Sequence, residues 1–269
     1  MLQLVEAGEL TLDEPVGARL AGHVGVTITD PAISAVTVQH LLAHTSGFGS
    51  YQRTFFGGSA ATCADAARTG LSSALERPAG ASYSYSNMNY CLLGLLVEDV
   101  TGESFESVAQ ERFLRPLGIA DMRMVATFDP DPNEVEHPSV PGRVYMEALG
   151  AAGAWVATAR DVVRIADSLE GSRPVWHPLS QRMMGLMRVP APTAVPPPAV
   201  RDSWYGMGEI VFADATWGHT GTVENTHAMV LVRPDGVTWA ILVSGEYPSQ
   251  TQRLRDIFDQ TLAAAGIQL

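Results

Sequence analysis

A chain of 269 residues is long enough for one large domain or two closely packed ones, and 46% hydrophobic residues suits a globular protein with a substantial core. The net charge of −12 argues against a nucleic-acid partner, because phosphate binding needs clustered cations. No apolar run reaches the roughly 18 residues that indicate a membrane span. All 17 cationic residues are arginines, so this chain carries no lysine-dependent step. Cys63 and Cys91 are too few for a disulfide framework or a metal site, and the sequence leaves open whether they pair.

Helical patterns dominate the first 190 residues. Residues 1–8 have the pattern of the end of an amphipathic helix that closes at Gly8. Thr37 is expected to begin a short helix that closes at Gly47, and His44 within it is expected to be structural. Further helices are expected at 60–76, 88–101, 104–114, from Thr158 to about Leu169, and at 178–188.

After the proline-rich stretch 188–200, the periodicity of the hydrophobic residues changes from that of a helix to that of a strand. Strands are expected over Tyr205–Phe212, Thr226–Val232 and Thr238–Ser244, with a turn at 233–236 and a closing helix at 250–265. Because the helices and strands are segregated along the chain, the pattern favours an α+β fold over alternating βαβ units.

The stretch Tyr85-Ser86-Asn87 leads directly into an apolar helical pattern. Ser86 or Asn87 alone would fit an ordinary helix N-cap. A loop fixed by a helix can also hold a phenol in one place, as a general base requires. Free tyrosine has a pKa of about 10, so Tyr85 would need a neighbouring cation to act as a base near neutral pH.

A second polar stretch, His219-Thr220-Gly221-Thr222, lies far down the chain and would alone suit an ordinary strand end. Together with other fragments in order, the two stretches resemble the penicillin-recognising serine hydrolases. These are the class C β-lactamases, D-alanyl-D-alanine carboxypeptidases and β-lactamase-like esterases. The fragments are "LVEAGELTLDEPV" at 4–16, "HLLAHTSGF" at 40–48, "YSN" at 85–87, "PLGIADM" at 116–122, "ATARDV" at 157–162, "YGMGEIV" at 205–211 and "GHTGTV" at 218–223.

The resemblance implies a role for each matching residue. Tyr85 would take the nucleophile's proton, and Asn87 would hold the substrate amide, with Ser86 also assigned to substrate binding. His219 and Thr220 would bind the substrate carboxylate on a sheet edge. Gly221 would leave room for a substrate backbone, and the Thr222 N–H would complete the oxyanion hole. The implied ligand is a β-lactam, D-alanyl peptide or ester, with no metal or organic cofactor, and His219 in place of lysine favours carboxypeptidases and esterases.

The family's first motif, Ser-x-x-Lys, is absent, because the chain has no lysine. By the motif's usual offset, the serine would lie roughly ten residues upstream of Met1. We expect a truncated hydrolase. The alternatives are a non-catalytic protein that binds peptidoglycan-like or acyl ligands, a fragment without a function of its own, and a second chain that supplies the missing segment. The compartment is open: periplasmic or secreted if that segment carried a signal peptide, otherwise cytoplasmic.

The resemblance also divides the chain. Residues 1–30 would be the remnant of the nucleophile helix and the following turn, and 31–150 a mostly helical region that carries Tyr85. Residues 151–269 would be an α/β region with the C-terminal strands and helix, and the cleft would lie between the two larger regions.

Overall fold

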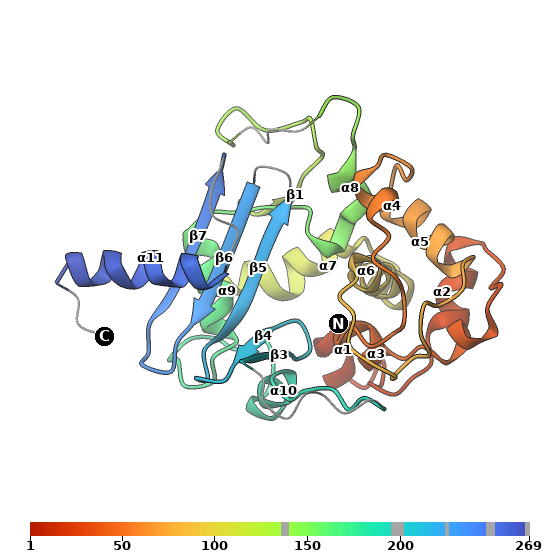
Figure 1. Cartoon of the computed structure of the whole chain (residues 1–269), viewed down its shortest axis with the longest axis horizontal. Coiled ribbons are helices and arrows are strands. Elements are labelled where there is room, and N and C mark those ends of the chain that lie inside the picture. The colour runs from red at the N-terminus through yellow and green to blue at the C-terminus, as the bar shows by residue number, and fades with distance from the viewer. Residues whose placement is uncertain (136–139, 195–201, 224–225, 246–250, 267–269) are drawn as a thin grey trace.

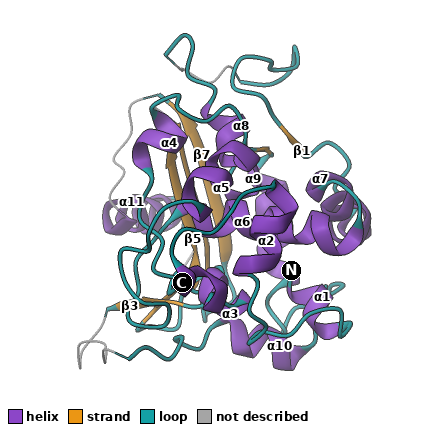
Figure 2. Cartoon of the chain, turned by 90° about the vertical axis from the view of Figure 1, so that its right-hand side faces the viewer, coloured by secondary structure: helices purple, strands orange, loops and turns teal. Residues whose placement is uncertain are grey.

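The structure is a computed structural model that describes residues 1–135, 140–194, 202–223, 226–245 and 251–266. A mostly helical region lies beside an antiparallel sheet in Figure 1, and Figure 2 views the helical region with the strands behind it. The α+β expectation is confirmed.

The helical region is built around α6 (Asn87–Thr101), which is buried along most of its length. A helix that is apolar on all sides belongs in the middle of a core. Its close contact with the turn Gly150–Ala152 depends on Gly94, where an added Cβ would lie 2.4 Å from Ala151 Cβ. The surrounding helices are α1 (Leu2–Glu6), α2 (Gly17–Val24), α3 (Val38–Leu42), α4 (Gln52–Phe56), α5 (Cys63–Leu71), α7 (Phe105–Ala109, continued by a π-helical turn Gln110–Leu114) and α8 (Tyr145–Leu149).

The five-stranded sheet has the order β3-β4-β5-β6-β7, and every neighbouring pair is antiparallel. Its strands are β3 (Ser203–Tyr205), β4 (Ile210–Phe212), β5 (Trp217–Val223), β6 (Thr226–Val232) and β7 (Thr238–Ser244). One face packs on α9 (Ala159–Ser168) through Trp217 and Val232. The other face packs on α11 (Thr251–Ala264) through Leu231 and Trp239, and Figure 1 shows α11 crossing it. The chain also forms α10 (Gln181–Met187) and a small sheet of β1 (Arg123–Met124) and β2 (Trp155–Val156).

Two strand predictions were incomplete. The expected strand over 205–212 is two short strands, β3 and β4, joined by a tight turn at 206–209. Gly208 has a left-handed φ of 97°, which a continuous strand does not accommodate. β5 was not among the strands expected from the pattern. Its sequence of Gly, His and Thr has weak strand character, and the strand is held by pairing with β6 along its whole length.

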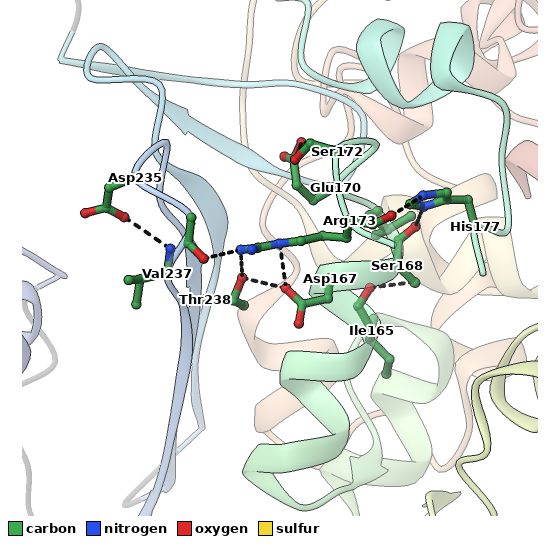
Figure 3. Close-up of polar contacts among 12 residues, drawn as sticks. Ile165, Asp167, Ser168, Glu170, Ser172, Arg173, His177, Asp235, Val237 and Thr238 are labelled. Atoms are coloured by element: carbon green, nitrogen blue, oxygen red, sulfur yellow. Dashed lines mark hydrogen bonds and ion pairs between the residues drawn. The ribbon is translucent and has the colours of Figure 1, made fainter. Parts of the chain in front are cut away.

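A polar cluster joins α9 and the following loop to the β6–β7 hairpin (Figure 3). Arg173 Nη2 donates to the Gly236 carbonyl at 2.6 Å and lies 3.1 Å from Thr238 Oγ1. Its Nε lies 3.3 Å from Asp167 Oδ1, which also accepts from the Thr238 hydroxyl at 2.7 Å. The Arg173 guanidinium therefore links β7, the edge strand of the sheet, to α9.

Cys63 and Cys91 form a disulfide that joins α5 to α6. This answers the pairing question that the sequence left open. Within the part of the chain that is described, no helix combines the length and the apolar character needed to cross a membrane.

Candidate active site

The loop that carries Tyr85 is fixed by the hydrogen bonds of Ser86, the residue that follows Tyr85. Ser86 is the N-cap of α6: its hydroxyl accepts from the Met88 N–H at 3.2 Å and donates to the Gly49 carbonyl at 2.6 Å. Ser86 is only 1% exposed. The N-cap alternative considered from the sequence therefore holds for Ser86, and a substrate would have to displace structural hydrogen bonds to reach its hydroxyl.

His44 also holds this loop in place through hydrogen bonds. Its Nδ1 accepts from the Ser86 backbone N–H at 3.2 Å and faces the Asn89 side-chain amide nitrogen at 2.9 Å. The Ser46 hydroxyl donates to the Asn89 oxygen at 2.6 Å, which fixes the amide orientation. Burial and the neighbouring His219 lower the pKa of His44 to about 3, so the ring is neutral near pH 7. This arrangement agrees with the structural role expected for His44.

Tyr85 lies over His44, with ring centroids 4.3 Å apart, and the residue is 45% exposed. Its hydroxyl has no hydrogen-bond partner among the described residues, and neither has the side chain of Asn87, the first residue of α6. Burial raises the pKa of the Tyr85 phenol above its usual value. The Tyr85 phenol is therefore accessible and held in position, but it is protonated at neutral pH.

His219, on β5, lies beside Tyr85. Its ring centroid lies 6.4 Å from that of Tyr85. Nε2 is 3.0 Å from the Tyr205 hydroxyl and Nδ1 is 2.7 Å from the Thr220 carbonyl oxygen, so both ring nitrogens already have protein partners. Burial lowers the pKa of His219, which favours the neutral ring.

The other predicted residues of β5 follow His219 along the strand. Only Trp217 and Gly218 pair with β4, so residues 219–223 have β6 on one side and form part of a sheet edge. Side chains alternate along a strand, which places Thr220 and Thr222 on the opposite sheet face from His219. Thr222 Oγ1 lies 3.1 Å from His227 Nδ1, and Gly221 is exposed. Because their side chains lie on opposite faces of the sheet, one ligand could contact both His219 and Thr220 only by reaching around the free edge of β5.

Sequence reasoning missed three tyrosines that surround these residues. Tyr205 from β3 stacks on Tyr83 with centroids 5.8 Å apart and meets His44 edge-on at 4.7 Å. Tyr90 from α6 lies 5.2 Å from His44 and donates its hydroxyl to the Leu42 carbonyl at 2.9 Å. The available signal was Tyr205 in the "YGMGEIV" fragment, which marked the family but was given no role.

Glu209, in the turn between β3 and β4, is a buried carboxyl beside this cluster. Its Oε2 lies 3.2 Å from Arg188 Nε, and its buried Oε1 has no hydrogen-bond partner. Burial raises the pKa of Glu209 to about 7, against the opposing effect of Arg188. The folded state therefore binds a proton that the unfolded chain, with an ordinary pKa of 4.5, has released.

The Glu209→Gln variant is expected to lose a pH dependence of stability. For wild type, stability should fall as pH rises from about 4.5 to about 7, because over this range the unfolded chain releases a proton that the folded state keeps; the size is at most about 3 kcal/mol. Urea unfolding of wild type and variant at intervals from pH 5 to pH 8 would measure this. An unchanged slope in Glu209→Gln would contradict the assignment.

Among the described residues no group of three or more His, Cys, Asp or Glu side chains is arranged to hold a metal ion. The chemistry that these residues offer is that of a phenol, a carboxamide, an imidazole and an open strand edge. They can position and protonate an acyl substrate, but no activated nucleophile is among them, because the chain lacks the lysine of the Ser-x-x-Lys motif.

The protein-family model described as Beta-lactamase matches residues 1–263. The chain therefore belongs to the Beta-lactamase family, and the resemblance found from the motifs is confirmed. Penicillin-binding protein 4 of Amycolatopsis lactamdurans is 26% identical over 303 residues, covering 100% of this chain and 74% of that protein.

Solved structures share the fold. A D-stereospecific amidohydrolase from Streptomyces sp. has a TM-score of 0.76 and 24% identity, covering 95% of this chain and 81% of that one. D-amino acid amidase from Ochrobactrum anthropi SV3 has a TM-score of 0.72 and 21% identity, covering 97% and 81%. Three further curated relatives match 49–54% of this chain over only 31–40% of their own length.

Proposed function

We propose that this chain forms the Tyr85 and β5 part of a serine-hydrolase site that cleaves amide or ester bonds through an acyl-enzyme. The observation that carries the proposal is the proximity of the Tyr85 and His219 rings. They come from distant parts of the sequence, their ring centroids lie 6.4 Å apart, and the Tyr85 hydroxyl has no hydrogen-bond partner among the described residues. A loop held by a capped helix gives the phenol the fixed geometry that proton transfer requires.

In this proposal Tyr85 carries the nucleophile's proton to the leaving group, and Asn87 holds the substrate amide. The free edge of β5 takes the substrate backbone, with the Thr222 N–H in the oxyanion hole and Thr220 at the carboxylate. His219 lines the site without offering a free ring N–H, since both its nitrogens already have protein partners. The nucleophile and its lysine come from polypeptide outside these 269 residues.

The substrate class is an acyl compound with an amide or ester bond: a β-lactam, a D-alanyl peptide or a simple ester. Two similar structures are named as a D-stereospecific amidohydrolase and a D-amino acid amidase, which supports an amide of D-configuration. The exposed edge at Gly221 supports a peptide-like ligand, because a strand edge offers backbone hydrogen bonds.

A second function is favoured by the absence of lysine. Without an activated serine, the same site would bind peptidoglycan-like or acyl ligands and release them unchanged. This reading differs from the first in one measurable respect, which is the formation of a covalent adduct.

The test is labelling with a fluorescent penicillin. The complete gene product and the 269-residue chain are each incubated with the probe, denatured and separated by electrophoresis. We expect a covalent band from the complete gene product and none from the 269-residue chain. A complete gene product that binds the probe reversibly but gives no band would support the binding protein instead. If neither form binds at all, both proposals are wrong for β-lactams, and the test is repeated with an activated ester.

A further inference from the structure

Both chain neighbours of Tyr85 are hydrogen-bonded to a single residue, His44. The Ser84 backbone N–H donates to the His44 carbonyl oxygen at 2.8 Å, and the Ser86 backbone N–H donates to His44 Nδ1 at 3.2 Å. The imidazole also packs against the Tyr85 ring, with centroids 4.3 Å apart. His44 therefore contacts the loop before, at and after the residue that carries the phenol.

The direction of the surrounding hydrogen bonds fixes the tautomer of His44. The Ser46 hydroxyl accepts from the Phe48 N–H at 3.2 Å and gives its own proton to Asn89 Oδ1 at 2.6 Å. The Asn89 amide nitrogen then faces His44 Nδ1 at 2.9 Å and donates to it. Because Nδ1 accepts from both Asn89 and the Ser86 N–H, the proton of the neutral ring is on Nε2.

This arrangement has two costs at the same residue. His44 has a left-handed φ of 54°, which is uncommon for a residue other than glycine. Its Nε2–H is buried and has no hydrogen-bond partner within the part of the chain that is described, and such orphaned donors are rare. An apolar side chain would fill the same space without an orphaned donor. Costs of this kind gather at functional sites, where the surrounding structure maintains them.

We propose that His44 is the positioning residue for Tyr85: its carbonyl oxygen and its Nδ1 fix the backbone on either side of Tyr85, and its ring sets where the phenol lies. The inference rests on the proposed function, in which Tyr85 carries the proton. His44 is only 1% exposed, so it acts through Tyr85 and touches no substrate itself. Loss of the Nδ1 acceptor should therefore slow acyl transfer more than it weakens substrate binding.

Two substitutions of His44 separate the acceptor from the rest of the side chain. His44→Asn keeps an acceptor, because Oδ1 stands as many bonds from the backbone as Nδ1, and asparagine tolerates the left-handed conformation. His44→Gly suits that conformation too but has no side-chain acceptor. Both lose the ring that packs on Tyr85. In the complete gene product we expect kcat/KM for an activated ester to fall about 10²-fold in His44→Gly, as a misplacement of about 1 Å produces, and less than about tenfold in His44→Asn.

A double-mutant cycle distinguishes positioning of Tyr85 from a general loss of structure. If His44 acts through the Tyr85 hydroxyl, His44→Gly should change kcat/KM only a few-fold once Tyr85→Phe has removed that hydroxyl. The loss in the Tyr85 background should fall mainly on kcat and leave KM within a few-fold. Equal fold losses in the two backgrounds would overturn the proposal, because His44 would then affect the rate without Tyr85.

His40 offers the matched control. It is a half-buried histidine whose Nδ1 also accepts a backbone N–H, that of Thr37 at 3.2 Å, but this bond closes the capping box of α3. His40→Ala should lower the thermal stability and leave kcat/KM within a few-fold of wild type. A fall in kcat/KM as large as that of His44→Gly would show that any damage to this region has the same effect, and would count against a specific role for His44.

Two NMR measurements on the 269-residue chain test the geometry without turnover. Long-range proton–nitrogen correlations of histidine-labelled protein report the tautomer of each ring, and His44→Asn assigns the signal. We expect a neutral His44 protonated on Nε2 from pH 5 to pH 9, and a neutral ring protonated on Nδ1 would overturn the proposal. The Ser86 amide should exchange slowly with solvent in wild type and in His44→Asn but faster in His44→Gly. Equal exchange in all three would overturn it as well.

These readouts keep the two proposals separate. If the complete gene product shows neither labelling nor turnover, the proposed function fails, while the tautomer and the Ser86 exchange still decide whether His44 fixes the backbone around Tyr85. If His44→Gly does not fold, the wild-type tautomer and the cycle of His44→Asn with Tyr85→Phe decide the question. In that cycle, the smaller loss of His44→Asn should again disappear when the Tyr85 hydroxyl is absent.

Discussion

Tyr85→Phe is expected to slow hydrolysis by the complete gene product about 10²–10⁴-fold, the usual contribution of a positioned proton carrier. The ring of Tyr85 packs against His44 at 4.3 Å, and phenylalanine keeps this contact. Its hydroxyl makes no hydrogen bond to the described residues, so its removal should cost little stability. The loss should therefore fall on acylation and deacylation and not on folding, as measured by kcat/KM with an activated ester and by urea unfolding.

Tyr83→Phe is the matched control for this substitution. Tyr83 lies two residues earlier in the same loop and is 46% exposed, against 45% for Tyr85. Its ring stacks on Tyr205, an interaction that phenylalanine retains. We expect its kcat/KM to stay within a few-fold of wild type. Equal losses in the two variants would show that the loop tolerates no change, and an active Tyr85→Phe would remove Tyr85 from the mechanism.

The state of the Tyr85 phenol connects this prediction to His219. Burial raises the pKa of Tyr85, so the phenol alone would be a poor base near pH 7. A cation close to the ring would lower that pKa. In the described part of the chain His219 is placed to supply it once protonated, 6.4 Å away between ring centroids. Under the proposed function, the lysine that accompanies the nucleophile would be a second source.

Local signals in the sequence were sufficient for helices that begin at a side-chain cap. Thr37 and Thr158 cap α3 and α9 through capping boxes, as their spacing to His40 and Asp161 indicates. Helices of five residues such as α4 and α8 were missed, because so short a helix is held by tertiary packing and leaves little periodic pattern. The break between β3 and β4 depended on the backbone conformation of one glycine, Gly208.

The sequence could point to the candidate site only where a residue belongs to a recognisable motif. Tyr85 and His219 could be found from two fragments, and the fold brings them together. The rings of Tyr90 and Tyr205 that pack against His44 could not, because they come from a helix and a strand that share no sequence pattern. Ser86 stands within the Tyr-Ser-Asn fragment, and its hydroxyl caps α6 and donates to the Gly49 carbonyl, while its assignment to substrate binding stays a prediction.

Reduction of the Cys63–Cys91 disulfide is expected to destabilise the folded chain by about 3–4 kcal/mol, from the entropy of closing a loop with a sequence separation of 28. For a chain of this length that corresponds to a fall in Tm of roughly 6–15 °C. The bond joins α5 to α6, the helix that fixes the Tyr85 loop. The measurement is the thermal transition with and without a thiol reductant, with free thiols counted in denaturant beforehand.

The double variant Cys63→Ser/Cys91→Ser separates the disulfide from other effects of the reductant. It should unfold near the temperature of the reduced wild type and should not respond to the reductant. Two free thiols in non-reduced, denatured wild type would contradict the disulfide. Because such bonds persist mainly in oxidising compartments, thiols trapped by alkylation in intact cells also bear on location. An oxidised pair there would place the working protein outside the reducing cytoplasm, while a reduced pair would leave α5 and α6 held by packing alone.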